Sequence, residues 1–353
     1  VIAACGILAF YAVLMGWTAH TFVHALFVGL PADMAEAKVF FGTVSSGNSA
    51  LLGQLLSLVL TALVVSAGVR GGIERLSRWF MPLLFLLLLL LAVWATTLSG
   101  AFEGYRTFLL RWDMHQLLNA TTVRNAFTQA FFSIGTGIGC ILAYSAYLDR
   151  RNHLPREAVA VVGMDTAVGL LAGMITFPVV MSFGLKDVVS ESTVGTLFIA
   201  LPTGLASLGF TGRLVAVLFF ALAYIAAITS SVSLLEVPVA SLMDRLGWRR
   251  RQAVWLSTAL IFVAGLPAAL DLEILGMMDA VFGGLLLIFG GLLLALLLGW
   301  RVPRRFDADL ADCETPKTVR RWLRFMLRWV SPPVIAFGLI VSVVDLVQKW
   351  FVA

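Results

Sequence analysis

Charge is what this sequence of 353 residues has little of. Only 13% of its residues are charged, whereas about a quarter is usual in a soluble domain. Hydrophobic residues make up 60% of the chain, and the mean hydropathy is +0.96. The apolar runs are continuous and do not alternate with polar residues as the strands of a membrane β-barrel do. These features exclude an ordinary soluble protein and predict an all-α polytopic membrane protein.

Cysteine is scarce as well, and the motifs of familiar enzymes are missing. Cys5, Cys140 and Cys313 lie far apart and form no pattern typical of a metal or redox site, so we interpret them as small apolar residues. The sequence contains no GxSxG, HExxH or P-loop motif. No enzymatic activity is therefore predicted.

The apolar runs predict nine membrane-spanning segments within a single transmembrane domain, 1–353. These segments cover residues 2–30, 51–69, 79–98, 125–147, 157–184, 214–243, 253–270, 274–300 and 322–347. The stretch 186–210 is too long for a simple turn and is partly apolar. We expect it to fold back over the outer face as a lid.

Basic residues gather in alternate loops, which predicts the orientation of the chain. With the chain start inside, most of the 25 lysines and arginines fall in inner loops. We therefore expect a multi-pass protein of the plasma (inner) membrane with the chain start, the arginine-rich loops and 301–321 in the cytoplasm. This distribution explains a pI of about 9.4 without a nucleic-acid partner. The cluster Arg245–Arg251 is expected to meet anionic lipid headgroups of the bilayer.

The fourth predicted span carries three glycines at alternate positions in its middle. Gly135, Gly137 and Gly139 would each cost about 1 kcal/mol in a helix relative to alanine. One interpretation is a broken helix, whose two halves meet at a site and offer N–H groups and carbonyls to ligands. The other is an intact helix whose small residues allow close packing against a neighbour. The spacing alone favours neither interpretation.

Two further spans carry polar residues, which are costly inside a membrane and often functional. The run Thr229–Ser231 offers hydroxyls that could complete an oxygen shell around a hard cation. The alternative, which the run taken in isolation favours, is hydrogen bonding back to its own helix. Asp165 is followed by Gly169 and Gly173, so we expect it beside a tight seam between helices. A lone carboxylate there requires a cation or a proton.

Five stretches, taken in order along the chain, carry the motifs of one known family. They are FYAVLMGW at Phe10–Trp17, QAFFS through Gly139 followed by LAYSAY, GMDTAVGLLAG around Asp165, LFIALP before the sixth span, and ITSSVSLLEVPVA at Ile228–Ala240. They resemble the third, sixth and seventh spans, the extracellular lid loop and the eighth span of the neurotransmitter:sodium symporter family. The bacterial amino-acid branch is the most similar. The resemblance implies a leucine-transporter-type fold of inverted repeats and sodium-coupled uptake of an amino acid.

The resemblance also implies roles for individual residues. Substrate contacts are expected from Tyr11, Phe132, Gly135, Ile138, Ser230 and Leu234, with Tyr11 at the substrate carboxylate and Phe132 as an aromatic lid. A first sodium ion is expected at Ser133 and Asp165, and a second at Ala226, Thr229 and Ser230. Gln129, Ser133 and Asp165 match the groups around the chloride ion of chloride-dependent members. Asp279 and Asp244 match the acidic halves of the outer and inner gates.

One departure from the family is large. The first predicted span matches the family's third, so the chain resembles spans three to eleven. The family's first span supplies half of each sodium site, the contacts to the substrate amine and the arginine of the outer gate. Since the sequence also begins without methionine, we expect a partial chain, with both Na⁺ sites completed by the missing first span.

The substrate-pocket positions predict a small-molecule substrate, a neutral and hydrophobic amino acid, with room at Gly135 for a branched or aromatic side chain. Gly135, Ile138 and Leu234 offer no charge to pair with an ionised side chain, which would be costly to bury alone. Asp165 supplies a fixed negative charge, so no chloride is expected. Two alternatives stay open at this point: another membrane transporter or channel, and a non-transporting scaffold or sensor of the same fold. The particular amino acid, the sodium stoichiometry and the oligomeric state are also open.

Overall fold

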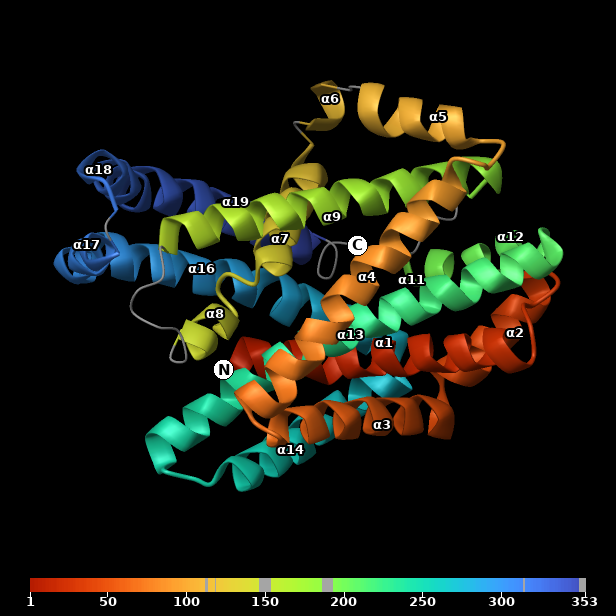
Figure 1. The fold of residues 1–353 in the computed structure, drawn as a ribbon, viewed down its shortest axis with the longest axis horizontal. Coiled ribbons are helices and arrows are strands. Elements are labelled where there is room, and N and C mark those ends of the chain that lie inside the picture. The colour runs from red at the N-terminus through yellow and green to blue at the C-terminus, as the bar shows by residue number, and fades with distance from the viewer. Residues whose placement is uncertain (112–113, 118, 146–153, 186–192, 314, 349–353) are drawn as a thin grey trace.

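The computed structural model describes residues 1–353 except 112–113, 118, 146–153, 186–192, 314 and 349–353. The regular structure of these described residues is entirely helical, with α-helices and short π-helical turns labelled η (Figure 1). Eight of the helical segments are long and apolar enough to cross a membrane. The all-α polytopic fold predicted from the hydropathy is confirmed.

The spanning segments follow the predicted runs, although the third begins at Val69 and not at residue 79 as predicted. They are α1 (Ile2–Phe27), α3 (Gly47–Ser66), η1 (Val69–Ile73) with α4 (Glu74–Ala95), α9 (Leu154–Ser182), α13 (Gly209–Leu246) and α14 (Arg250–Leu270), then α15 (Leu272–Met278), η4 (Asp279–Leu285), α16 (Leu286–Leu296) and η5 (Leu297–Arg301) as one rod, and α18 (Lys317–Phe325), η6 (Met326–Val330) and α19 (Ser331–Val347) as another. The remaining predicted span is divided into α7 (Ala120–Ile134) and α8 (Cys140–Ser145). Over the residues that the structure describes, neither half is long enough to cross a membrane alone.

Shorter helices connect the spans. They are α2 (Met34–Ser45), α5 (Ala101–Tyr105), η2 (Arg106–Leu110), α6 (Met114–Leu117), α11 (Thr193–Gly195), η3 (Thr196–Ala200), α12 (Leu201–Ala206) and α17 (Pro303–Asp312). The start of α2 shows the local cause of such a helix. Asp33 accepts a hydrogen bond from the Glu36 amide at 2.8 Å, and Glu36 accepts one from the Ala32 amide at 2.7 Å. These reciprocal bonds satisfy free N–H groups at the start of the helix.

The centre of the molecule is α1, which contacts α3, α13 and α14. Most of the side chains along its middle are buried: Ile7, Leu8 and Trp17 have no exposed surface. Gly16 allows α1 to cross α3 with the two backbones in contact, because a Cβ atom there would lie 2.6 Å from the carbonyl carbon of Gly53. Of the residues expected at the substrate and sodium sites, Tyr11 lies on α1 itself, and Ala226, Thr229 and Ser230 lie on α13, which contacts α1.

The two ends of the bundle differ in charge. The end of α13, the start of α14 and the turn between them carry the cluster Arg245–Arg251 and lie at the left end of Figure 1, as do α17 and α18. The helices α2, α5 and α12 lie toward the opposite end. The arginine-rich segments thus share one end of the molecule, as the predicted orientation requires. The expected lid segment is helical over residues 193–206, and 186–192 lie outside the described residues.

Candidate functional site

The fourth predicted span is broken at its glycines. The helix α7 ends at Ile134, and Gly135 follows in the left-handed conformation at φ +71°. Gly137 and Gly139 also have positive φ, at +93° and +98°, before α8 begins at Cys140. Side chains with a Cβ atom are strained in this region, so glycine at alternate positions is what allows the chain to unwind here.

The unwound segment also packs closely against another helix. A Cβ atom on Gly137 would lie 2.7 Å from the backbone nitrogen of Gly291 in α16. The broken-helix interpretation is therefore confirmed and the intact helix is wrong, although the small residues do allow close packing, here against α16. The backbone of α16 covers the unwound segment on one side. The segment is flanked by the last residue of α7 and the first residue of α8.

A carboxylate reaches the broken helix from α9. The hydroxyl of Ser133, in the last turn of α7, donates a hydrogen bond to Oδ1 of Asp165. Ser133 is exposed and Asp165 is half-buried, and Gln129 is exposed one turn earlier on α7. The structure thus brings together the residues expected for the first sodium ion. Two oxygen ligands of this kind are what a hard cation prefers.

The expected tight seam next to Asp165 is wrong. Among the described residues, no neighbouring atom lies within 4 Å of a Cβ atom built on Gly169. Gly173 faces the aromatic ring of Phe108, a side chain and not a helix backbone. The spacing of two glycines on one face does not show which neighbour lies opposite. Asp165 is held by its hydrogen bond to Ser133.

The residues expected for the second sodium ion lie on α13. The Thr229 hydroxyl donates to the Ala226 carbonyl at 2.8 Å, and the Ser230 hydroxyl donates to the same oxygen at 3.2 Å. The hydroxyls therefore bond back to their own helix, as the favoured alternative predicted. The three oxygens still gather at one spot, next to α1, where the Tyr11 side chain lies beside Ser230. Each hydroxyl oxygen keeps lone pairs that a cation can use.

The expected substrate pocket is apolar. Ile138 and Leu234 are only 6% and 5% exposed, and both belong to the main core cluster, with Phe132 packed against it. Gly135 adds no side chain, which leaves space at the break. No residue of this group is charged, so the pocket suits an apolar side chain.

The expected outer-gate carboxylate lies near charges that the sequence did not predict. Asp279 at the start of η4 is exposed, and the charge that acts on it comes from Arg124 in α7. Arg124 itself forms an ion pair with Asp345 in α19. Thr121 also donates to Asp345, at 3.3 Å. The elements α7, η4 and α19 contact one another, so these charges share one end of the broken helix.

The sequence analysis also missed a buried ion pair between α13 and α14. Glu236 has no exposed surface and pairs with Arg250 of α14, whose Nε donates to the Val65 carbonyl at 2.8 Å. The expectation that the whole cluster Arg245–Arg251 meets lipid headgroups is therefore wrong for Arg250. Asp244, the expected inner gate, is exposed. Opposite charges near the facing ends of two consecutive predicted spans were an available signal for Glu236–Arg250, but no signal pairs Arg124 with Asp345, which lie at the fourth and the ninth predicted spans.

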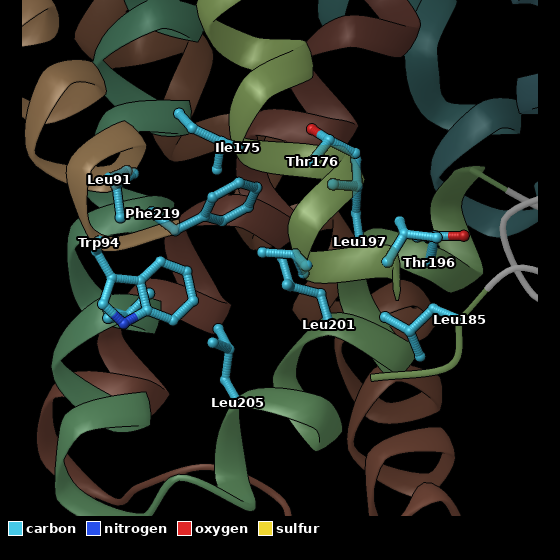
Figure 2. Close-up of a pocket in the computed structure, with 13 residues that line it drawn as sticks. Leu91, Trp94, Ile175, Thr176, Leu185, Thr196, Leu197, Leu201, Leu205 and Phe219 are labelled. Atoms are coloured by element: carbon cyan, nitrogen blue, oxygen red, sulfur yellow. The ribbon is translucent and has the colours of Figure 1, made fainter. Parts of the chain in front are cut away.

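A small cavity lies apart from these residues. Its volume is about 50 Å³, and it lies between α4, α9, α13 and the helical segment η3–α12 (Figure 2). Its lining is apolar except for Thr176 and Thr196, and includes Leu91, Trp94 and Phe219. None of the residues expected at the substrate or sodium sites lines it.

The fold defines the class: a helical membrane protein with many spans, one of which is broken at the candidate site. Residues 42–352 match the model of the sodium:neurotransmitter symporter family, and the chain belongs to this family. It is a family of transporters and not of enzymes. The resemblance seen in the sequence is confirmed.

Sodium-dependent transporters are among the relatives of this chain. An uncharacterized one from Bacillus subtilis is 36% identical over 78% of this chain and 60% of its own length. Another, from Haemophilus influenzae, is 28% identical over 94% of this chain and 75% of its own length. The crystal structure of MhsT in complex with L-phenylalanine matches with a TM-score of 0.86 at 32% identity, and covers 97% of this chain and 79% of MhsT. The chain thus spans part of the length of each.

Proposed function

We propose that this chain belongs to a sodium-coupled symporter for a neutral, hydrophobic amino acid. The observation that carries the proposal is the broken helix α7–α8, where Ser133 meets Asp165 beside the apolar side chains of Ile138 and Leu234. Unwound backbone and oxygen ligands suit a cation and the charged ends of an amino acid, and the apolar residues suit its side chain. Similarity to MhsT, solved with L-phenylalanine, supports a hydrophobic substrate.

Two sodium ions take part in this proposal. Ser133 and Asp165 hold the first ion, and Ala226, Thr229 and Ser230 hold the second. The remaining ligands of both ions come from the family's first span, outside residues 1–353. The substrate carboxylate binds next to Tyr11 and Ser230, Phe132 closes over the substrate, and Gly135 leaves room for its side chain.

Asp165 makes transport independent of chloride in this proposal. A sodium ion bound beside a zwitterion leaves one positive charge in a site of low dielectric constant, and a nearby carboxylate offsets that charge. Gln129 and Ser133 lie on the same side of α7 as expected for an anion site, but Ser133 is bonded to a carboxylate. A carboxylate at this position takes the place of the anion.

Access to the site runs between two ends of the bundle. Asp279 belongs to the outer gate and Asp244 to the inner gate, and 186–210 covers the outer side. The arginine-rich end of Figure 1, including 301–321, faces the cytoplasm and the protein lies in the plasma membrane. The separation of basic loops from the opposite end supports this orientation.

Uptake by the full-length protein in proteoliposomes tests the function. An inward sodium gradient should drive accumulation of a labelled neutral amino acid, and replacing sodium with potassium should abolish it. Leucine, phenylalanine or tryptophan should compete with the labelled substrate. Strong competition by lysine or glutamate with none by the apolar amino acids would rule out the substrate class, and uptake without sodium would rule out the coupling.

A further inference from the structure

An arginine is held between two tryptophans where two spanning segments end. Trp300 lies in η5 at the end of one segment, and Arg328 and Trp329 lie in η6 near the start of the other. The guanidinium carbon of Arg328 is 4.9 Å from the centre of the Trp300 ring and 5.5 Å from that of Trp329. Both distances are within the range of cation–π attraction.

Backbone contacts keep this arrangement in place. The Trp300 indole nitrogen donates to the Arg328 carbonyl at 3.1 Å, and the two indole rings meet edge to face at 5.4 Å. Gly299 lies against the backbone of η6, because a Cβ atom there would be 2.6 Å from the Leu327 carbonyl oxygen. The position of the Arg328 guanidinium is therefore defined by two helices and does not depend on a single flexible side chain.

The charge of Arg328 is not neutralised by a carboxylate among the described residues. Asp307 of α17 is the nearby acid that forms ion pairs, and it is taken by Arg320 and Arg324 of α18. Arg328 is exposed, as are Arg301 and Arg321. This group of cations therefore lacks counter-charges within the part of the chain that the structure describes.

The tryptophan side chains around Arg328 are largely exposed. Trp300 is 50% exposed, Trp329 56% and Trp322 of α18 57%. Exposed tryptophans at the ends of membrane spans lie at the level of the lipid headgroups, where the ring contacts glycerol and upper acyl chain and the N–H group meets a polar atom. Exposed arginines at this level attract anionic lipid.

We propose that Trp300, Arg328 and Trp329 form a binding site for the headgroup of an anionic phospholipid, with Arg301 and Arg321 as further cations. The guanidinium binds the lipid phosphate through its outward N–H groups, while the two indoles hold its plane. The apolar ring surfaces contact the glycerol and the start of the acyl chains. The site lies apart from the broken helix, so it does not depend on the transport proposal.

Lipid titration of the purified full-length protein tests the site. Phosphatidylglycerol added in mixed detergent micelles should raise the melting temperature more than phosphatidylcholine does. In Arg328→Gln the apparent affinity for phosphatidylglycerol should fall about fivefold, the effect of one basic residue near an anionic surface. The control Arg324→Gln, which removes an arginine paired with Asp307, should keep the wild-type response. Equal responses to both lipids, or an unchanged response in Arg328→Gln, would overturn the proposal.

A second measurement leaves Arg328 unchanged in case its variant does not fold. In vesicles, brominated phosphatidylglycerol should quench the tryptophan fluorescence more than brominated phosphatidylcholine, and this excess should disappear in the Trp300→Phe, Trp329→Phe double variant. Equal quenching by the two lipids contradicts the site. So does full competition by inorganic phosphate, which would identify a soluble anion as the occupant. Dimerisation that is lost in Trp329→Ala would instead assign the surface to a second copy of the chain.

Discussion

At the scale of single residues, the oxygens of α13 give the most direct test of a sodium site. Thr229→Val with Ser230→Ala keeps similar volumes but removes the two hydroxyls that converge on the Ala226 carbonyl. We expect sodium affinity to fall roughly tenfold or more, as for the loss of interactions between hydroxyls and a charge. The measurement is the sodium concentration for half-maximal uptake or substrate binding by the full-length protein.

The matched control for that variant is Thr176→Val. The Thr176 hydroxyl bonds back to the Ala172 carbonyl at 2.9 Å within α9, so the same type of hydrogen bond is lost away from the proposed ions. It should leave the sodium dependence unchanged. If both variants respond alike, the hydroxyls of α13 stabilise the helix and do not hold sodium.

The charge of Asp165 predicts how transport responds to chloride. Uptake should persist when chloride is replaced by gluconate, because the carboxylate already offsets the positive charge of the bound sodium. Asp165→Asn should abolish uptake or make it depend on chloride, since the amide removes that charge and keeps the shape. The comparison is uptake with and without chloride, for both proteins. A collapse of wild-type uptake in gluconate is incompatible with this role.

At the scale of elements, the packing of the broken helix on α16 predicts that Gly137→Ala is damaging. The new Cβ atom would be strained at φ +93°, by roughly 1–2 kcal/mol, and would meet the backbone of Gly291. We expect a lower melting temperature and a loss of substrate binding. Gly163→Ala is the control, because this helical position in α9 is exposed and has no neighbour within 4 Å among the described residues. If the melting temperature and substrate binding fall equally in both variants, the backbone conformation at Gly137 is not specifically required.

The ion pair between α13 and α14 predicts a second effect at this scale. Glu236→Ala leaves Arg250 largely buried without its carboxylate, which typically costs about 3–5 kcal/mol. Glu74→Ala removes an exposed pair with Arg78 and should cost about 1 kcal/mol or less. Thermal unfolding of the purified variants in detergent measures the difference. Similar melting temperatures for the two would show that Glu236 and Arg250 are solvated in the protein.

At the scale of the whole molecule, the arginine-rich end predicts which parts face each side of the membrane. In a variant with Cys5, Cys140 and Cys313 replaced, a cysteine at exposed Arg304 should react with an impermeant maleimide only after the cells are opened. A cysteine at Phe210, which is 82% exposed at the start of α13, should react in intact cells. The reverse labelling pattern would invert the proposed orientation.

The sequence by itself determined the class of protein, the path of the chain and the location of the break. An apolar run long enough to cross a bilayer has to satisfy its own backbone hydrogen bonds, so it forms a helix whatever its neighbours are. For this reason the predicted spans reappear in the structure. The three glycines in one span marked Gly135–Gly139 as the place where the helix is weakest, because the low helix propensity of glycine does not depend on tertiary contacts. The pairing of Ser133 with Asp165 followed from motifs that resemble a family.

Only the tertiary structure decided which charges and which helices meet. Whether 135–139 unwinds depends on the backbone of α16, more than a hundred residues further along the chain. The partners of Arg250 and Arg124 lie on other spans, and sequence spacing carries no information about which spans are neighbours. The sequence also did not show what lies opposite Gly169. We expected a neighbouring helix there, beside Asp165, but no described atom lies within 4 Å of a Cβ atom built on Gly169. Contacts between distant helices depend on the packing of all of them together, so they are defined only once the chain has folded.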